Sequence, residues 1–146
     1  MVKLLLGLVL CGILLVATIS ASRLQSVSVK GRLRCGNKPA KGVTVKIVDD
    51  DTGLDPDDDL KEGKTDDSGR FELTGHEKEF SDIDVFLKIY HDCLDGITPC
   101  QRRWKLKVPD HYITRGSETP TKTLDIGTWN LELVMEEEER DCWNKK

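Results

Sequence analysis

The sequence predicts an all-β fold, an antiparallel β-sandwich of about seven to eight short strands. Apolar and polar residues alternate in short segments, turn-forming residues separate those segments, and no segment shows an amphipathic helical repeat. The chain has 146 residues, of which about 124 remain after a leader of 22. That length suits one domain with a single core. Short alternating strands joined by turns favour two antiparallel sheets packed face to face.

The first strands are predicted in the N-terminal half of the mature chain. Each has apolar residues of one parity, which would face the core from a half-buried strand. The first two such sets are Val27, Val29, Leu33 and Cys35, then Val43, Val45 and Ile47. A turn at residues 36–39 separates them, and Phe71 and Leu73 alternate in the same way after the turn at Ser68 and Gly69.

Three further segments in the C-terminal half alternate in the same way. They contain Ile83, Val85, Leu87 and Ile89; Trp104, Leu106 and Val108; and a last set running from Leu124 to Met135. The last set changes parity, because Leu124 and Ile126 are even whereas Trp129, Leu131, Leu133 and Met135 are odd. Gly127 and Thr128 therefore mark a turn or a β-bulge.

The N-terminus predicts export. Lys3 precedes an apolar run at residues 4–16, and small residues follow at 17–22, as in a secretory signal peptide. The run is shorter than the roughly 20 residues that cross a bilayer, and no second long apolar run follows. We predict a signal peptide over residues 1–21, cleaved near 20–22, and one domain over 22–146. The protein is expected to be secreted and extracellular, without a transmembrane anchor.

Secretion makes the cysteines candidates for disulfides. Cys11 leaves with the leader, so four remain: Cys35, Cys93, Cys100 and Cys142. An even number in an oxidising compartment predicts two disulfides, for which three pairings are possible. We favour Cys93 with Cys100, because the short segment between them contains a glycine and a proline and can turn back. That choice leaves Cys35 to pair with Cys142.

The charge balance excludes a general nucleic-acid binder. Without the leader the chain has 21 lysines and arginines against 26 aspartates and glutamates, whereas such a binder needs a basic excess. One basic segment stands out at residues 101–107. If Trp104 faces the core, then Arg103, Lys105 and Lys107 project together from the other face and are candidates to contact an external anionic ligand. Alternatively they pair with the protein's own acidic residues at 49–59 or 136–139.

The acidic segment at residues 49–59 carries a weak calcium hypothesis. An EF-hand alignment places Asp55, Asp57 and Asp59 at the first, third and fifth ligand positions. The alignment then fails, because Leu60 takes the place of the turn glycine and Asp66 that of the bidentate glutamate. The alternative is a solvated loop. No other metal site and no cofactor are predicted.

His91 and Cys93 also resemble a nucleophile pair or part of a zinc site. Secretion and the even number of cysteines favour Cys93 in a disulfide instead. His91 has the parity of the inward-facing residues, so we predict a hydrogen-bonded histidine in the core or at a strand edge. No nucleophile elbow, Walker loop or dinucleotide fingerprint is present.

Several motifs in order resemble the nematode transthyretin-like family, and together they cover essentially the whole mature chain. The similar segments are residues 29–35 (VKGRLRC) with 38–46 (KPAKGVTVK), 55–59 (DPDDD) with 65–71 (TDDSGRF), 87–93 (LKIYHDC), 109–113 (PDHYI) and 139–142 (ERDC). The resemblance implies a transthyretin-like, or prealbumin-like, sandwich of two antiparallel sheets. It also implies an extracellular protein from a family not known for catalysis.

A related enzyme offers a second class of function. The 5-hydroxyisourate hydrolases of the same superfamily end in Tyr-Arg-Gly-Ser, whereas this chain ends in CWNKK. Residues 112–117 (YITRGS) are similar only superficially, because they contain inserted residues and lie inside the chain. General acid and base groups must lie within hydrogen-bond reach of the reacting atoms, so this partial match does not support hydrolase activity.

The sequence therefore predicts a secreted, non-catalytic binding or carrier module. Its expected partner is an extracellular protein, a lipid or a small apolar molecule. The alternatives are a hydrolase related to 5-hydroxyisourate hydrolase, a bridging protein that binds anionic phospholipid, and a structural or cuticle-associated protein. Self-association into a homo-oligomer is also compatible with the sequence.

Overall fold

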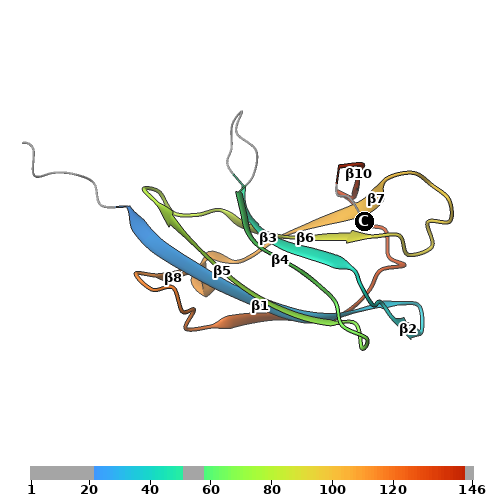
Figure 1. Ribbon diagram of the computed structural model, residues 1–146, viewed down its shortest axis with the longest axis horizontal. Coiled ribbons are helices and arrows are strands. Elements are labelled where there is room, and N and C mark those ends of the chain that lie inside the picture. The colour runs from blue at the N-terminus through green and yellow to red at the C-terminus, as the bar shows by residue number, and fades with distance from the viewer. Residues whose placement is uncertain (1–21, 51–57, 144–146) are drawn as a thin grey trace, which may run out of the picture.

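The computed structural model is a sandwich of two β-sheets, and it describes residues 22–50 and 58–143 (Figure 1). Each sheet has five strands, and the predicted all-β fold class is confirmed. The helical content of the described residues is one 3₁₀ turn at Asp110–Tyr112. The predicted leader and its cleavage site lie outside the described residues.

The first sheet is organised around the long strand β1. Three strands pair with β1 in the antiparallel sense, but β9 runs parallel to it, which the prediction of a purely antiparallel sandwich did not include. The strands are β1 (Arg23–Cys35), β2 (Lys38–Pro39), β5 (Arg70–Glu79), β8 (Thr114–Arg115) and β9 (Thr123–Asn130).

The second sheet has the strand order β10-β7-β6-β3-β4, with every neighbour antiparallel. Its strands are β3 (Thr44–Asp49), β4 (Asp58–Lys64), β6 (Val85–His91), β7 (Gln101–Lys107) and β10 (Glu139–Asp141). The two edge strands β4 and β10 are mostly polar and were not predicted. An edge strand can be specified by its backbone hydrogen bonds to a neighbour rather than by an apolar face.

The parity change in the last predicted strand is a β-bulge within β9. From Lys30 to Arg32 strand β1 advances two residues, while β9 advances three, from Asp125 to Thr128. Gly127 adopts φ +73°, a left-handed conformation that suits glycine. The residues after Asn130 leave the sheet, so the odd-parity residues up to Met135 do not extend the strand.

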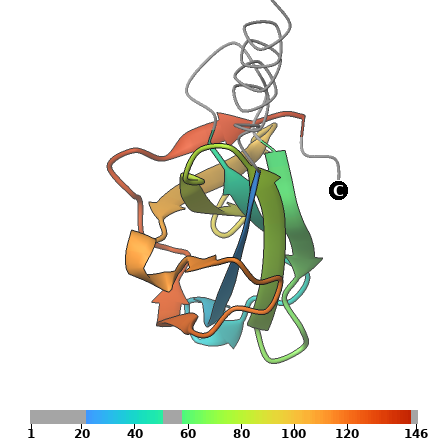
Figure 2. The same cartoon turned by 90° about the vertical axis from the view of Figure 1, so that its left-hand side faces the viewer.

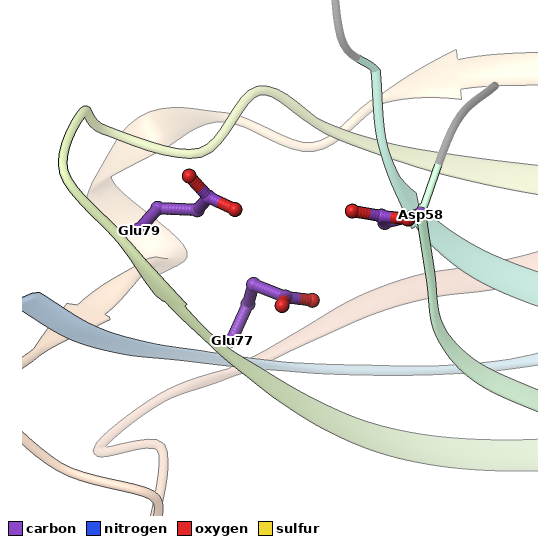
Figure 3. A group of neighbouring side chains, drawn as sticks. All are labelled: Asp58, Glu77 and Glu79. Atoms are coloured by element: carbon purple, nitrogen blue, oxygen red, sulfur yellow. The ribbon is translucent and has the colours of Figure 1, made fainter. Parts of the chain in front are cut away.

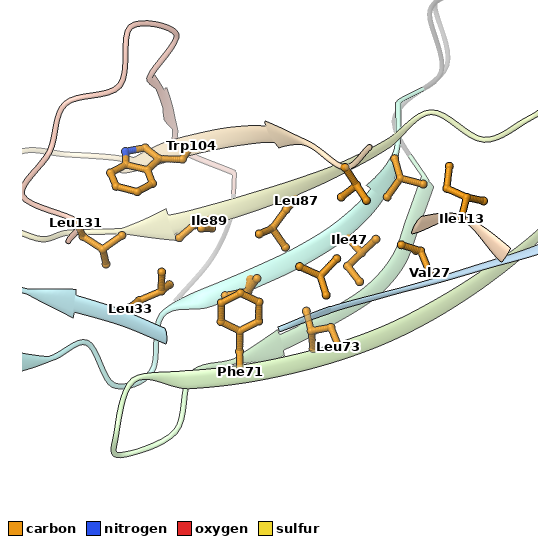
Figure 4. Close-up of a cluster of buried hydrophobic side chains, with 14 of the residues drawn as sticks. Val27, Leu33, Ile47, Phe71, Leu73, Leu87, Ile89, Trp104, Ile113 and Leu131 are labelled. Atoms are coloured by element: carbon orange, nitrogen blue, oxygen red, sulfur yellow. The ribbon is translucent and has the colours of Figure 1, made fainter. Parts of the chain in front are cut away.

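The apolar residues of one parity fill the space between the sheets (Figure 4). Trp104, Leu33 and Leu131 are fully buried at one end of this core, and Val27 and Ile113 lie toward the other. Burying a large apolar side chain contributes about 1.5–3 kcal/mol, so this cluster supplies the main stabilisation of the sandwich.

The predicted disulfide pairing is wrong, although all four cysteines form disulfides. Cys35 pairs with Cys93, and Cys100 pairs with Cys142. Cys93 is buried and follows the inward parity of β6, which directs it to the end of β1 in the opposite sheet. Cys100 precedes β7, where Asp141 of β10 lies opposite Gln101, and this register brings Cys142 to Cys100. The first disulfide joins the two sheets, and the second attaches the C-terminal segment.

Candidate functional site

Three segments gather at one end of the sandwich, which we call the loop end. They are residues 92–100 between β6 and β7, residues 131–138 between β9 and β10, and residues 142–143 after β10. Figure 1 shows β10 and the C-terminal segment beside the loop that enters β7. The hydrogen bonds and the disulfide described next join the three segments.

Arg102 is the buried centre of the loop end. Only 6% of this residue is exposed, although it is charged. Its guanidinium donates hydrogen bonds to three backbone carbonyl oxygens: Cys93 at 2.9 Å, Leu131 at 3.0 Å and Leu133 at 2.7 Å. It also forms a two-pronged pair with the Glu138 carboxylate, Nε to Oε1 and Nη2 to Oε2, each at 2.7 Å. One side chain therefore holds both long loops in place.

Glu138 is bound from two sides. Its Oε2 atom also accepts a hydrogen bond from Trp104 Nε1 at 2.7 Å, so the loop carboxylate is attached to the core tryptophan. The hydrogen bond from Arg102 holds the pKa of Glu138 below its usual range. Glu138 is therefore ionised in neutral solution, as pairing with a buried guanidinium requires.

His91 lies beside this group and is kept neutral. Burial, followed by the charge of Arg102, lowers its pKa to about 4. Its Nδ1 atom accepts a hydrogen bond from the Cys93 backbone N–H at 3.3 Å, and its ring meets Trp104 edge to face. Nε2 has no hydrogen-bond partner among the described residues. The predicted hydrogen-bonded, inward-facing histidine is what the structure contains.

Two further links hold the C-terminal segment against the first loop. Arg140 donates hydrogen bonds to both carboxylate oxygens of Asp95, at 2.9 and 2.6 Å, and to the backbone oxygen of Cys100 at 3.1 Å. The Cys100–Cys142 disulfide lies beside them. Cys100 (φ +68°) and Leu94 (φ +54°) have left-handed backbones, which are uncommon for residues other than glycine and cluster at functional sites.

Apolar side chains project into solvent from all three segments. We call these five residues the apolar loop surface: Leu94 (75% exposed), Ile97 (103%), Leu133 (55%), Val134 (80%) and Trp143 (89%). Phe80, at 70%, is the remaining large apolar side chain of high exposure among residues 22–50 and 58–143, and it follows β5. The loops that carry the surface contain no lysine or arginine, but they do contain Asp92, Asp95, Glu132 and the acidic residues 136–138.

A pocket of about 240 Å³ lies next to the inter-sheet disulfide. It is lined by Cys35, Cys93, His91 and Leu131, together with residues 40–43 and Gln101. Its position between the sheets makes it a second place where a small molecule can contact the loop end.

The basic residues of β7 are paired within the protein. Arg103 pairs with Glu139 and with Asp141, the latter at 3.2 Å, while Lys105 pairs with Asp50 at 2.6 Å and Lys107 with Asp84. The three side chains do share the outer face of the sheet, and two of them also lie over the ring of Phe86. These contacts favour the internal alternative over an external anionic ligand.

The calcium hypothesis stays a prediction, because most of its residues lie outside the described part of the chain. Asp55 and Asp57 lie outside the described residues, and Asp59 forms an ion pair with Lys46 at 2.8 Å. A different group of carboxylates does converge: Asp58 of β4 with Glu77 and Glu79 of β5, whose nearest oxygens all lie within 4.8 Å of one another (Figure 3). Sequence reasoning missed this group because its members belong to strands of different sheets.

The segment that resembles the hydrolase terminus is engaged in local structure. Arg115 forms a two-pronged pair with Asp82, at 3.2 and 3.1 Å, and Ser117 closes a turn with Thr119. These contacts leave the arginine in an exposed ion pair at a strand end and give no support to hydrolysis. The described residues contain no helix long and apolar enough to cross a membrane.

Comparison with known proteins supports the resemblance found in the motifs. The model of the Transthyretin-like family matches residues 30–109, which is more than half of the chain. Transthyretin-like protein 33 of Caenorhabditis elegans is 50% identical over 121 residues, covering 83% of this chain and 84% of that protein. Transthyretin-like protein 5 of the same organism is 50% identical over 118 residues (81% and 84%), and transthyretin-like protein 2 is 42% identical over 142 residues (91% and 95%). The names of these relatives describe no catalytic activity.

Proposed function

Because the chain belongs to the transthyretin-like family, we propose that it is a secreted, non-catalytic binding module that engages an extracellular partner through its apolar loop surface. The mature protein is expected to begin near residue 22, after removal of the leader. Edman or mass-spectrometric determination of the N-terminus of the protein recovered from culture medium tests this part, and a chain retained inside the cell with its leader intact would contradict it.

The observation that carries the proposal is the exposure of five apolar side chains at one end of the molecule. Single exposed apolar residues are ordinary on a protein surface, but a group of them on neighbouring loops is typical of an interaction site. The exposure is combined with restraint, because Arg102 and the Cys100–Cys142 disulfide hold the loops in place. Ordered loops lose less conformational entropy on binding, which favours affinity.

The charge of the loops around the apolar loop surface indicates which class of partner it binds. The loops that carry the apolar surface contain no basic residue, and Glu132, Glu136 and Glu137 are exposed on them, so they repel anionic phospholipid. A protein with an apolar pocket and a basic rim, or a small apolar molecule, is favoured instead. The bridging role with anionic phospholipid therefore receives less support at this end than a protein or apolar ligand.

Photo-crosslinking can test the surface directly. A crosslinking amino acid at Ile97 is compared with one at Lys61, which is exposed on β4 away from the loop end. In native extracellular fluid, position 97 should give a distinct crosslinked product. Unlabelled parent protein should suppress that product, whereas a variant with serine at Ile97, Val134 and Trp143 should not. Equal products from both positions, or equal competition by both proteins, would refute the proposal.

The competing enzyme hypothesis has its own test. We expect the purified mature protein not to accelerate the hydrolysis of 5-hydroxyisourate above the rate in buffer, measured by ultraviolet absorbance. Multiple turnovers per chain would establish a hydrolase and would move attention from the loop end to Arg115 and its neighbours.

A further inference from the structure

The outer face of the first sheet holds a group of arginines that the basic segment at 101–107 does not include. The β1–β5 register places Arg32 directly opposite Arg70, and Arg34 lies two residues further along β1 on the same face. Figure 2 shows β1 (blue) between β5 (green) and the strands at the other side of this sheet. Opposite residues in an antiparallel pair have Cβ atoms about 4.5–5.5 Å apart. The strand register therefore places the two arginine side chains at neighbouring positions on the same face of the sheet.

Among the described residues, these arginines have no carboxylate partner within ion-pair distance, unlike the basic residues on the outer face of β7. Within the described part of the chain, no carboxylate forms an ion pair with Arg32, Arg34 or Arg70. By contrast, all three basic side chains on the outer face of β7 have such a partner. Like charges directly opposite each other destabilise a sheet, so the pair is an electrostatic cost in the isolated protein.

The carboxylates near the pair are directed to other groups. Asp66 Oδ1 accepts hydrogen bonds from the Ser68 backbone N–H, the Ser68 hydroxyl and the Arg70 backbone N–H, which holds Asp66 in its own turn. Asp125 accepts from the Gly127 N–H and lies 3.9 Å from Lys30. Glu72 is opposite Lys30 in the β1–β5 register. Lys30 is thus flanked by two carboxylates, whereas Arg32 and Arg70 have one nearby carboxylate, Asp66, whose pKa is lowered by the hydrogen bond from the Arg70 backbone N–H and further by the charge of Arg70. Two guanidiniums beside one carboxylate leave this part of the face with a net positive charge.

The surface around Arg32 and Arg70 is hollowed and carries hydrogen-bond donors that can bind an anion. A shallow depression of about 590 Å³ covers it; the cations Lys30, Arg32 and Arg70 line it with Thr128, and so do the carboxylates of Asp66, Glu72 and Asp125. Arg32 Nε donates to the backbone oxygen of Ser68 at 2.9 Å, which orients the guanidinium and leaves its terminal N–H groups for another acceptor. Thr128 is beside Arg32 in the β1–β9 register and adds a hydroxyl donor. Guanidinium groups bind tetrahedral oxyanions through paired hydrogen bonds.

We propose that Arg32 and Arg70 form a binding site for a single sulfate or phosphate group on the outer face of the first sheet. The site is separate from the apolar loop surface, and it goes beyond the binding role proposed above. Arg34 and Thr128 are its peripheral contacts. The bound oxyanion removes the repulsion between the two guanidiniums, so binding and stability are coupled.

Titration with inorganic sulfate and inorganic phosphate tests the site, with chloride at matched ionic strength as the reference. Calorimetric titration and thermal unfolding are measured on the parent protein, on Arg32→Gln and on Arg70→Gln. Lys78→Gln is the matched control, because Lys78 is exposed on β5 and makes the same change of charge. We expect each arginine variant to weaken oxyanion binding at least tenfold and the control to change it less than twofold. Arg32→Lys should also weaken binding, because it keeps the charge but loses the paired donors.

The unfolding temperature measured without the oxyanion shows whether the arginines bind a ligand or instead stabilise the fold. In chloride alone, Arg70→Gln should unfold at the same temperature as the parent protein or higher, since it relieves the repulsion. A lower unfolding temperature for this variant in chloride would contradict the proposal. So would equal binding by the arginine variants and the Lys78 control, or stabilisation by sulfate no greater than by chloride, which would mean an adventitious ion only.

Two further probes identify where the group comes from. A sulfated oligosaccharide prepared from heparin represents an ester sulfate, and vesicles containing phosphatidic acid represent a phosphate head group. Binding of either probe that is lost in Arg32→Gln and kept in Lys78→Gln supports the site and assigns its source. If Arg32→Gln and Arg70→Gln still bind both probes as the parent protein does, the proposed oxyanion site is wrong.

Discussion

Glu138→Ala is the most informative single change, because it removes the partner of a buried charge. It deletes two hydrogen bonds to Arg102 at 2.7 Å and leaves Trp104 Nε1 without its acceptor at 2.7 Å. Breaking a buried ion pair from one side costs about 3–5 kcal/mol, and a buried N–H left unsatisfied costs about 1–3 kcal/mol. These contributions overlap, so we expect a loss of about 4 kcal/mol, a large part of the ~5–15 kcal/mol that stabilises a domain.

Urea unfolding of the disulfide-intact protein measures this loss, and two further variants sharpen it. Glu137→Ala is the matched control, since its exposed neighbouring carboxylate should change the free energy of unfolding by less than about 0.5 kcal/mol. The double variant Arg102→Met with Glu138→Leu should be more stable than Glu138→Ala, because no buried charge remains. A loss below about 1 kcal/mol for Glu138→Ala would refute the role given to Arg102.

The same pair predicts acid sensitivity of the loop end. Its hydrogen bond from Arg102 lowers the pKa of Glu138 in the folded protein below the ordinary value of 4.5. The stability from this group is therefore complete above about pH 4.5 and is lost as the pH falls through the lower folded value. Hydrogen exchange at residues 131–134 should accelerate in that acid range before exchange in the core strands does.

Three other predictions concern different parts of the molecule. The pKa of His91 falls from 6.5 to about 4 on folding, so the free energy of unfolding should decrease by on the order of 3 kcal/mol as the pH drops from 6.5 toward 4. In the His91→Phe variant, the midpoint of urea unfolding should depend less on pH over this range. Replacing Arg103, Lys105 and Lys107 with glutamine should lower the free energy of unfolding by 0 to about 1 kcal/mol per ion pair and leave association with anionic vesicles unchanged. A loss of vesicle binding would instead support the external anionic ligand. The denatured, unreduced mature chain should show no reactive thiol; two per chain would mean that one of the two disulfides is absent, and four would contradict both.

The candidate site was only partly predictable from the sequence. Arg102 has the parity of Trp104, so the alternation of β7 does indicate that it faces inward, although the basic segment drew attention to its outward neighbours. Glu138 carries no such signal, because it lies in a run of four glutamates that the sequence does not distinguish. Its role depends on a contact with a strand 36 residues away.

The sequence by itself determined the strand pattern and the family, because alternation and turn residues act locally and leave a readable period. It also indicated that the four cysteines after the predicted leader form disulfides, as they do in the structure. Tertiary structure alone decided which cysteines meet, which strand runs parallel and which cations are neutralised. Those outcomes depend on which strands become neighbours, as Lys105 shows by pairing with Asp50 from 55 residues away while Arg32 faces Arg70. Register across sheets sets these contacts, and register is a property of the assembled sandwich.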